Sequence, residues 1–344
     1  MEDILKLQKK IIPELVELLE KRYNILRAIY YNQPVGRRIL ADKLSLGERI
    51  VRSEINFLKD QNLISISAAG MMITQEGEEV IDKLKDFIHE LRGLSEIEQS
   101  VKDCLGLKEV LVVPGDMDSD GTVVSEIGRI AAHYLKDIVR DNSIIALTGG
   151  TTIKEVIDNF PKISNMKNVL VVPARGGMGR NVEIQANNLA ANLAGKIGAS
   201  YKLLHVPDNL SNNAMNTLLD EKDVREIVDN IHKSDILIYG IGRADEMARR
   251  RGLNFEQIDK LHELGAVGEA FGYYFNPKGE IVYSTPTIGV KYGDIKKIDV
   301  IIAIAGGKNK AEAIIATEIN NSNSILITDE GAAREILKIK NYVS

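Results

Sequence analysis

The sequence predicts an α/β protein with an N-terminal winged helix-turn-helix and a doubly wound, mostly parallel sheet. Three observations lead to this fold class. Amphipathic segments followed by two short β-rich runs fill the first 75 residues. From about residue 101, short β-branched runs alternate with helical segments, which is typical of a buried parallel sheet. Glycine-rich turns follow several of these runs, where such sheets bind ligands.

Composition narrows the class of protein. The chain has 344 residues, of which 44% are hydrophobic and 27% charged, enough for two or three soluble domains. Its apolar runs are too short to cross a bilayer, and its start lacks the apolar core of a signal peptide. The single cysteine, Cys104, excludes an internal disulfide and a cysteine-based zinc cluster. We therefore expect a cytoplasmic protein without membrane contact, metal ion or cofactor.

Three helices and a hairpin are predicted in order at the N-terminus. Residues 13–31 form an amphipathic helix that ends before Pro34, residues 36–44 form a short second helix, and residues 48–61 form a third. Ser45 and Gly47 lie in the turn between the second and third helices and could cap them. Residues 63–67 and 71–74 form the hairpin. This order is that of a winged helix-turn-helix, which binds DNA.

The charge distribution supports DNA binding by this segment. Residues 21–59 contain nine Lys or Arg and three Asp or Glu, a net charge of +6, so the rest of the chain sums to −11. The third helix of such a fold normally enters the major groove, and the flanking bases hold phosphates. We expect double-stranded DNA to be contacted by the following residues: Arg37, Arg38, Ser45, Arg49, Arg52 and Ser53.

A further amphipathic helix over residues 75–91 connects the two parts, and its apolar seam suits docking or dimerisation. The expected domains are residues 1–92, which include this helix, and residues 93–344. In the second domain, strands are predicted over residues 109–114, 143–147, 168–172, 201–205, 236–239, 300–305 and 324–328. Helices are predicted over residues 122–139, 151–159, 182–196, 211–220, 222–233, 255–264 and 308–320.

Four strand ends carry polar or cationic groups beside glycines. They are residues 148–152, 172–177, 239–245 and 305–310, which include Arg175, Lys308 and Lys310. Glycines allow close backbone approach, and a helix start attracts an anion. Four such turns in one domain indicate a phosphorylated ligand. The spacings match neither a P-loop nor a dinucleotide fingerprint.

Several of these features have simpler interpretations. Thr151 could be a plain helix cap, and Lys308 and Lys310 could be solvated residues of a first helical turn. Asp116, Asp118 and Asp120 resemble a run of oxygen ligands, but the glycine and glutamate that complete a calcium loop are missing. We interpret that run as a solvated loop.

The sequence resembles the SorC/DeoR group of sugar-responsive bacterial transcription regulators over essentially its whole length. The segments that carry the resemblance are residues 148–152, 172–178, 183–187, 265–271 and 306–310. The resemblance implies an effector-binding and oligomerisation domain with the fold of phosphosugar isomerases and deaminases, without catalysis. It also implies a homodimer or homotetramer that represses glycolytic genes, with fructose-1,6-bisphosphate or a related sugar phosphate as inducer.

The resemblance transfers the group's effector contacts to particular positions. These are Gly149, Gly150, Thr151, Thr152, Arg175, Gln185, Arg250, Glu269 and Lys310. Turn N–H groups and threonine hydroxyls suit one phosphate, the cationic side chains suit further phosphate charge, and Gln185 and Glu269 suit sugar hydroxyls. Arg249 and Arg251 flank Arg250, so a shift of one residue would place either of them at that contact.

An alternative from another class is an active phosphosugar isomerase or deaminase with a DNA-binding appendage. Such an enzyme needs a general base beside the sugar carbons, usually a carboxylate or a histidine. Glu269 and His205 are the candidates near predicted strand ends, and the sequence contains no Asp-His-Glu constellation around them. We therefore expect a regulator without catalytic residues.

Overall fold

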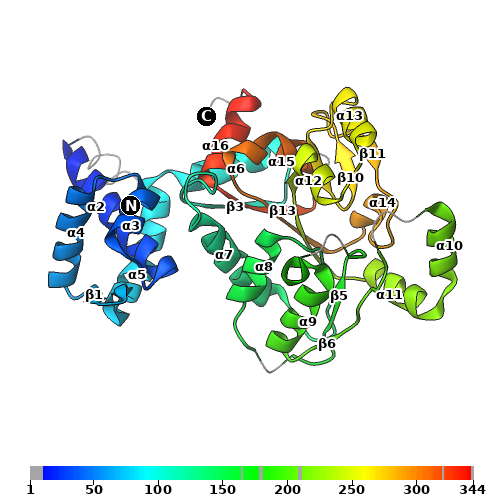
Figure 1. Cartoon of the computed structure of the whole chain (residues 1–344), viewed down its shortest axis with the longest axis horizontal. Coiled ribbons are helices and arrows are strands. Elements are labelled where there is room, and N and C mark those ends of the chain that lie inside the picture. Colours follow the sequence, from blue (N-terminus) through cyan, green and yellow to red (C-terminus); the bar gives the residue numbers. More distant parts are fainter. Residues whose placement is uncertain (1–10, 164–165, 178–180, 208–210, 320, 342–344) are drawn as a thin grey trace. The chain divides into compact units, whose positions relative to one another are not determined.

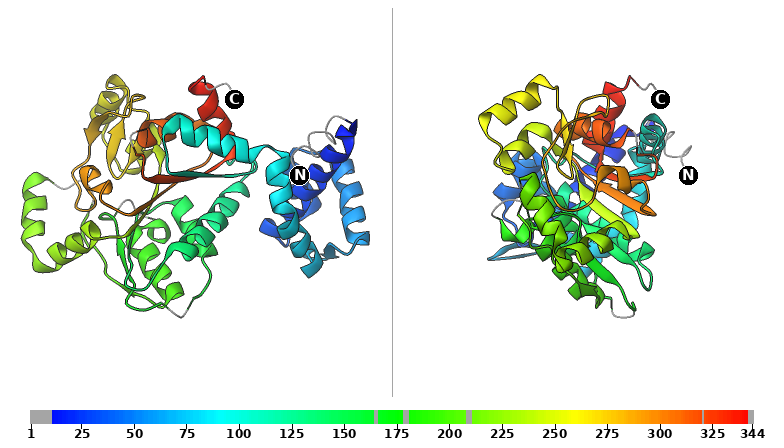
Figure 2. Two further views of the ribbon diagram at one scale, coloured as in Figure 1. Left: turned by 180° about the vertical axis from the view of Figure 1, so that it is seen from behind. Right: turned by 90° about the vertical axis from the view of Figure 1, so that its right-hand side faces the viewer.

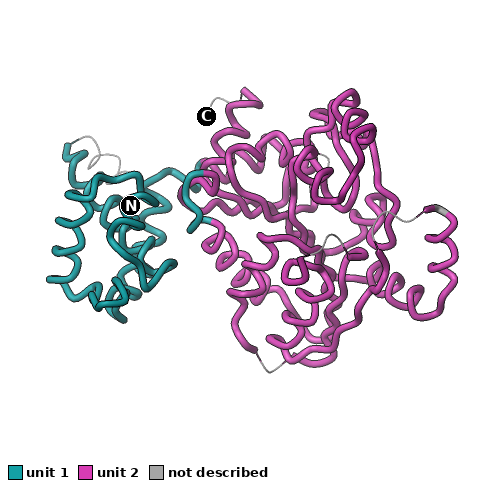
Figure 3. Tube along the Cα trace, viewed as in Figure 1, with its two compact units in different colours: residues 1–96, 119–123 teal, residues 97–118, 124–344 magenta. Residues whose placement is uncertain are grey.

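The computed structural model describes residues 11–163, 166–177, 181–207, 211–319 and 321–341. The chain folds into two compact units (Figure 3). The N-terminal unit comprises Met1–Glu96 together with Ser119–Val123, and the C-terminal unit comprises Ile97–Asp118 and Val124–Ser344. The short stretch Ser119–Val123 thus belongs to the first unit, although the chain on both sides of it belongs to the second.

The N-terminal unit contains the winged helix-turn-helix that the sequence predicts. Its elements are α2 (Pro13–Asn32), α3 (Arg37–Leu44), α4 (Glu48–Asp60), β1 (Ile64–Ser67), β2 (Gly70–Ile73) and α5 (Gln75–Leu91). Strands β1 and β2 pair antiparallel, and Val35 forms a bridge to Met71 beside them. Large apolar side chains such as Tyr23, Leu40 and Leu58 are fully buried and hold the helices against the hairpin.

The turn between α3 and α4 has separate caps for the two helices. Ser45 ends α3 in the left-handed region, with φ 52°, and its N–H bonds to the last carbonyls of that helix. Gly47 is the N-cap of α4. Ser45 therefore lies in the predicted turn between the two helices, where it caps α3, and Gly47 caps α4.

The C-terminal unit is built on a seven-stranded sheet with the order β3-β13-β12-β7-β4-β5-β6, and every pairing in it is parallel. The strands are β3 (Glu109–Val113), β4 (Ile144–Leu147), β5 (Leu170–Pro173), β6 (Ser200–Tyr201), β7 (Ile236–Gly240), β12 (Val300–Ile304) and β13 (Ser324–Asp329). The central strands β4, β5, β7 and β12 are almost wholly apolar because helices cover the sheet (Figure 1, Figure 2).

The helices of this unit alternate with strands as predicted. They are α6 (Leu94–Leu105), which begins at the junction, α7 (Val123–Ile138), α8 (Thr151–Asn159), α9 (Ala186–Ile197), α10 (Asn212–Asp220), α11 (Lys222–His232), α12 (Ala244–Arg250), α13 (Phe255–Glu263), α14 (Tyr292–Ile295), α15 (Ala311–Glu318) and α16 (Glu330–Ile339). Of these, α6, α12, α14 and α16 were not among the predicted helices. Two short 3-10 helices, η1 (Val182–Ile184) and η2 (Lys308–Lys310), precede α9 and α15. Helix α9 packs on β5, α8 on β7 and α16 on β13, so helices from different parts of the chain cover the sheet.

A second sheet was not predicted from the sequence. Strands β8 (Gly242–Arg243), β9 (Gly268–Ala270), β10 (Tyr273–Phe275) and β11 (Ile281–Ser284) form a four-stranded sheet in the order β11-β10-β9-β8, with antiparallel pairing. Gly268 lies against α15, where a Cβ would come within 2.9 Å of the Ala313 carbonyl oxygen. The side chains of α12 and α13 pack with Tyr274 of this sheet in a small apolar cluster.

Candidate functional site

The strand order places a crevice between β4 and β7. The strands that follow β4 in the chain, β5 and β6, lie on one side of it in the sheet. The later strands β7, β12 and β13 lie in that order on its other side. Ligands in open α/β sheets bind beyond the carboxyl ends of the strands at such a reversal. Thr148 follows β4 at this point, and its hydroxyl accepts a hydrogen bond of 3.3 Å from the N–H of Gly240 at the end of β7.

The Gly149-Gly150 turn is held tightly beside this crevice. A Cβ on Gly149 would lie 2.5 Å from the Ile184 carbonyl oxygen, so that position requires glycine. Gly150 has a φ of 135°, and its N–H donates to the same carbonyl at 2.8 Å. Thr151 and Thr152 then open α8; Thr151 is exposed and Thr152 is buried. The turn thus presents a helix start with its positive dipole end.

The floor of the site is a buried cluster of charges. Arg251 Nη2 lies 2.6 Å from Glu269 Oε1, and the side chains of both residues are 3% exposed. Arg175 Nη1 lies 3.9 Å from the same oxygen, and the Gly272 N–H also donates to it. Arg175 follows β5, and Gly289 packs so closely against it that a Cβ there would lie 2.6 Å from the Arg175 Cα. The two arginines neutralise a carboxylate that would otherwise be costly to bury.

This floor opens into a small cavity of about 50 Å³. Four of the residues predicted to bind effector line it, namely Gly149, Arg175, Gln185 and Glu269. A larger cavity of about 640 Å³ lies between α10, α11 and β11, but none of the predicted effector residues lines it.

Arg250 and Lys310 form a second charged group and are not among the residues that line the small cavity. Burial lowers the pKa of the Lys310 ammonium and the neighbouring Arg250 lowers it further, whereas Glu246, Asp118 and Asp329 raise it. An anion bound here would remove the repulsion between the two cations. The predicted phosphate contacts therefore divide into a buried set with Arg175 and a more open set with Lys310.

Arg251 lines the cavity, whereas the sequence-based prediction named its neighbour Arg250 and left a shift of one residue open. Arg250 is exposed, whereas Arg251 is buried and lines the cavity. A signal was available in the spacing, because Ala244, Ala248 and Arg251 recur at intervals of four and three residues and share the buried face of α12 and its C-cap. The one-residue shift left open by the sequence thus has a structural basis, although Arg250 keeps a place beside Lys310.

Phe271 forms another wall of the cavity and has a φ of 55°, which is uncommon for an aromatic residue. Its ring packs against Tyr239 with centroids 4.4 Å apart. The Tyr239 hydroxyl donates to the fully buried Glu318. Burial raises the pKa of the Glu318 carboxyl to about 7, although the hydrogen bond from Tyr239 acts in the opposite direction. The Glu318 carboxyl, whose pKa is elevated, is thus linked to Phe271 in the cavity wall through the Tyr239 side chain.

All six residues predicted to contact DNA are exposed on the N-terminal unit. Arg37 and Arg38 at the start of α3, and Arg49 and Arg52 on α4, line one surface groove. Arg38 forms a loose ion pair of 3.8 Å with Glu48, and both side chains remain largely exposed. Four cations from two helices therefore line the same groove, which is the electrostatic footprint of a DNA-binding surface.

Three of the basic residues counted in the predicted positive charge form ion pairs within the N-terminal unit. Lys21 and Arg22 pair with Glu54, each at 2.8 Å, and Arg27 pairs with Asp120 at 3.0 Å. Burial raises the pKa of the Glu54 carboxyl, but the hydrogen bonds and charges of Lys21 and Arg22 outweigh this and lower it. The DNA-facing charge is therefore smaller than the sequence count suggests.

The prediction of a solvated loop for the three aspartates is incomplete, because Asp118 is exposed but all three carboxylates also accept hydrogen bonds from the chain. Asp116 Oδ1 accepts the Lys308 N–H at 3.3 Å, and Asp118 Oδ2 accepts the Asn309 N–H at 2.8 Å. Asp120 accepts both the N–H and the hydroxyl of Thr122 and pairs with Arg27. We call residues 116–120 the acidic loop. Its carboxylates are structural acceptors for groups that are distant in sequence.

Comparison with known proteins identifies the family. The profile described as "Putative sugar-binding domain" matches residues 89–338, and the "CggR N-terminal DNA binding domain" matches residues 18–88. The chain is 41% identical to the central glycolytic genes regulator of Bacillus subtilis over 98% of this chain and 99% of that protein. It is 38% identical, with a TM-score of 0.66, to a crystal structure described as the "putative SorC family transcriptional regulator from Enterococcus faecalis", covering 70% of this chain and 99% of that one.

The chain belongs to the SorC family of transcription regulators. The full-length sorbitol operon regulator SorC from Klebsiella pneumoniae has the same fold, with a TM-score of 0.63 and 20% identity over 94% of this chain and 99% of that one. This SorC-family member therefore combines a DNA-binding domain with a sugar-binding domain and is a regulator, which removes the isomerase or deaminase alternative. Among the described residues, no helix has both the length and the apolar character needed to traverse a bilayer.

Proposed function

We propose that this regulator represses glycolytic genes from the cytoplasm and leaves its operator when it binds fructose-1,6-bisphosphate or a closely related triose or hexose phosphate. The observation that carries the proposal is the presence of two separate hollows lined by arginine side chains, one on each unit. The arginine groove of α3 and α4 suits duplex phosphates, and the strand-end cavity suits a small phosphorylated ligand. The similarity to the central glycolytic genes regulator of Bacillus subtilis supports the choice of glycolytic genes.

The charges around the cavity favour a ligand with two phosphates. Arg175 and Arg251 lie at its floor, and Arg250 and Lys310 form the second charged group. The start of α8, with Thr151 and its neighbour Thr152, would hold one phosphate, because free N–H groups and hydroxyls converge there. Gln185 and Glu269 would bind sugar hydroxyls. Glu269 tolerates a nearby phosphate because Arg251 already neutralises it.

On the DNA side, the roles follow from position on the helices. Arg49, Arg52 and Ser53 lie in the first two turns of α4, the helix that enters the major groove in this fold. Arg37 and Arg38, at the start of α3, would hold backbone phosphates, and Ser45 would contribute from the turn. We further propose that the operator is bound by a homodimer or homotetramer assembled through the C-terminal domain, residues 93–344, with residues 1–92 as the DNA-binding domain.

The effector must bind the DNA-incompetent arrangement more tightly than the DNA-bound one. A coupling free energy of about 1–3 kcal/mol is typical of allosteric proteins and corresponds to a change of about 5- to 150-fold in operator affinity. We expect the wild-type protein to fall in this range. A ligand that binds both arrangements equally would leave operator affinity unchanged, however tightly it bound.

Operator affinity measured by fluorescence anisotropy with and without fructose-1,6-bisphosphate tests the proposal. The operator fragment is first selected from random duplexes by binding to the protein. Arg175→Ala should weaken effector binding at least 10-fold and leave effector-free DNA affinity within about 2-fold, because a hydrogen bond to a charged group contributes about 1.5–3 kcal/mol. Arg52→Ala should weaken operator binding by about 1–3 kcal/mol and spare the effector, whereas Arg37→Ala should lower the salt slope of DNA binding by about 1.

Two outcomes would contradict this reasoning. If fructose-1,6-bisphosphate, glucose-6-phosphate and both triose phosphates all leave the operator affinity of the wild-type protein unchanged, the proposed function is wrong. If Arg175→Ala loses DNA and effector binding together, the residue stabilises the fold instead of the ligand. Arg175→Lys serves as the conservative comparison, because it keeps the charge but loses the bidentate geometry.

A further inference from the structure

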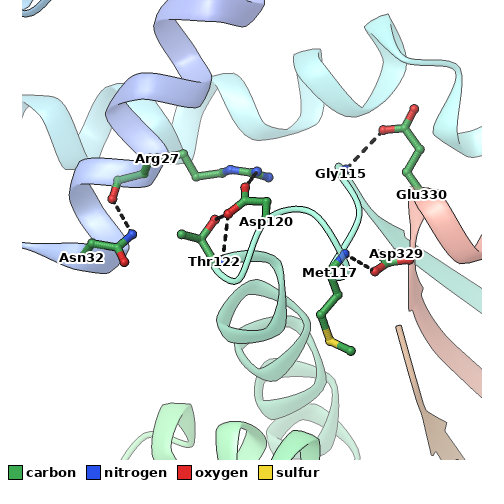
Figure 4. Close-up of polar contacts among 9 residues, drawn as sticks. Arg27, Asn32, Gly115, Met117, Asp120, Thr122, Asp329 and Glu330 are labelled. Carbon is green, nitrogen blue, oxygen red and sulfur yellow. Dashed lines mark hydrogen bonds and ion pairs between the residues drawn. The ribbon is translucent and has the colours of Figure 1, made fainter. Parts of the chain in front are cut away.

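The acidic loop forms hydrogen bonds in two directions. One set joins it to the turn of residues 306–310, which contains Lys310, and the other joins it to α2 of the N-terminal unit. Asp116 and Asp118 accept hydrogen bonds from the N–H groups of Lys308 and Asn309, in the loop that ends at Lys310. Asp120 pairs instead with Arg27 on α2 (Figure 4). Only one residue, Ser119, separates the carboxylates that face these two directions. Neither the DNA groove nor the small cavity uses this loop.

At the effector end, carboxylates already occupy an anion-binding position. The Gly307 N–H donates to Asp329 at 2.7 Å, and the next two N–H groups, of Lys308 and Asn309, donate to Asp116 and Asp118. Successive N–H groups at the start of a helix are where proteins bind phosphate. Asp329 also accepts the Met117 N–H at 2.8 Å, so it ties this turn and the acidic loop together.

The packing around these bonds is close. Gly307 has a φ of 98°, and a Cβ at that position would lie 2.6 Å from the Asp118 carboxylate. Asp118 also influences the charge of Lys310, since it is among the groups that raise the pKa of that ammonium. A phosphate that reached Lys310 would therefore compete with Asp118 for the same cation and would repel its carboxylate.

At the other end, the loop belongs to the N-terminal unit. Ser119–Val123 is part of that unit, and within it Arg27 Nη2 lies 3.0 Å from Asp120 Oδ2. The Arg27 side chain is only 5% exposed, and that of Asp120 is 16% exposed. The Asp120 carboxylate also accepts hydrogen bonds from Thr122, immediately before α7, so its orientation is fixed by three donor groups.

We propose that the acidic loop is the relay through which a sugar phosphate at Lys310 loosens the hold of the protein on DNA. The relay rests on the proposed function. The phosphate displaces Asp118 from the N–H of Asn309, the loop rearranges, and the Asp120–Arg27 pair on α2 changes with it. The loop as described, with all its bonds formed, corresponds to the DNA-competent arrangement, and the effector favours the released one.

The relay makes an unusual prediction for Asp118→Asn. This exposed residue keeps an oxygen that accepts the Asn309 N–H but loses the charge that opposes a phosphate. We expect fructose-1,6-bisphosphate to bind at least 3-fold more tightly, by isothermal titration calorimetry, because the competition has gone. At the same time its effect on operator affinity should shrink at least 5-fold, because the two arrangements now differ less in effector affinity. A merely structural residue would not move these two readouts in opposite senses.

Breaking the other end of the relay should separate binding from response. Asp120→Asn and Arg27→Gln should each keep effector affinity within about 3-fold of wild type while the effector no longer changes operator affinity more than about 2-fold. The matched control is Arg22→Gln, which breaks an ion pair of 2.8 Å to Glu54 in the same unit without touching the acidic loop. The control should keep the wild-type response.

The outcomes separate the relay from the proposed function. A wild-type protein that does not respond to fructose-1,6-bisphosphate overturns the proposed function and the relay with it. A wild-type protein that responds, together with Asp118→Asn and Asp120→Asn variants that respond equally, overturns the relay alone. Should the buried-pair variants unfold, which circular dichroism reports, the exposed Asp118→Asn variant decides the question by itself.

Discussion

Replacing Arg251 with methionine is the most direct test of the charged floor of the cavity that we propose binds the effector. The change removes the guanidinium 2.6 Å from Glu269 and keeps an unbranched side chain of similar length. Glu269 then retains the Gly272 N–H and Arg175, whose Nη1 lies 3.9 Å away. Removing one partner of a buried ion pair costs about 3–5 kcal/mol, because the other charge is left without compensation.

Because Glu269 keeps these two partners, we expect the free energy of unfolding to fall by about 3 kcal/mol, the lower end of that range. In a unit of this size each kcal/mol lowers the melting temperature by about 2–4 °C, so Arg251→Met should melt about 6–12 °C below wild type. The neighbouring Arg250→Met is the matched control, because Arg250 is exposed and its change should stay within about 0.5 kcal/mol. The chain has no tryptophan, so a dye-based thermal shift or circular dichroism is the suitable assay.

The double variant Arg251→Met/Glu269→Met completes the cycle. With both charges gone no carboxylate is buried unpaired, so most of the lost stability should return, which would give a coupling of more than about 1 kcal/mol between the two sites. The reasoning is refuted if Arg250→Met and Arg251→Met lower the melting temperature equally, or if the double variant is less stable than Arg251→Met. Either result would mean that Arg251 is not the cation that holds Glu269.

Two further predictions concern the walls of the same site. Burial raises the pKa of the Glu318 carboxyl from 4.5 to about 7, so the folded state favours the protonated acid. As the pH rises from 4.5 to 7, the wild-type protein therefore loses stability relative to Glu318→Gln, which has no charge to bury. Urea unfolding should therefore show the variant more stable by about 3 kcal/mol at pH 8 and nearly equal to wild type at pH 4.5; an equal difference at both pH values would contradict this. Gly149→Ala should destabilise the protein by about 1–3 kcal/mol and abolish effector binding, because its Cβ would lie 2.5 Å from the Ile184 carbonyl oxygen. The control is Gly195→Ala, at an exposed helical position with no atom within 4 Å of the added Cβ, which should stabilise the protein by about 0.5–1 kcal/mol. If Gly195→Ala destabilised the protein as much as Gly149→Ala, the close packing at Gly149 would not explain the loss.

Features that repeat along the chain could be predicted from the sequence. The apolar strands β4, β7 and β12 and the amphipathic α2 and α4 have patterns set by local periodicity, which one sequence displays fully. The sheet β8 to β11 escaped prediction because its strands have two to four residues, and three of the four, all except β11, have no β-branched residue. Such strands form because a neighbouring element covers them, which local pattern does not reveal.

The site was only partly predictable for a related reason. The turn at Gly149 and the arginine after β5 follow directly from strand–turn–helix order, so their positions could be anticipated. The roles of the acidic loop could not, because Asp118 accepts a hydrogen bond from a residue 191 positions away in the chain. A carboxylate run has the same appearance in sequence whether water or a distant backbone satisfies it. Arg251 differs from Arg250 only in helical phase, which the triple arginine run concealed.

The two margins of the seven-stranded sheet limit how copies of this chain can join. At one margin β6 contains just Ser200 and Tyr201, which offer little backbone for another strand to pair with. At the other margin the Val112 N–H of β3 donates to the Glu98 carboxylate of α6 at 2.7 Å, so that donor is already occupied. Short or occupied margins discourage intermolecular strand addition and the aggregation that follows from it. The seven-stranded sheet therefore offers little free edge for pairing with the sheet of another copy.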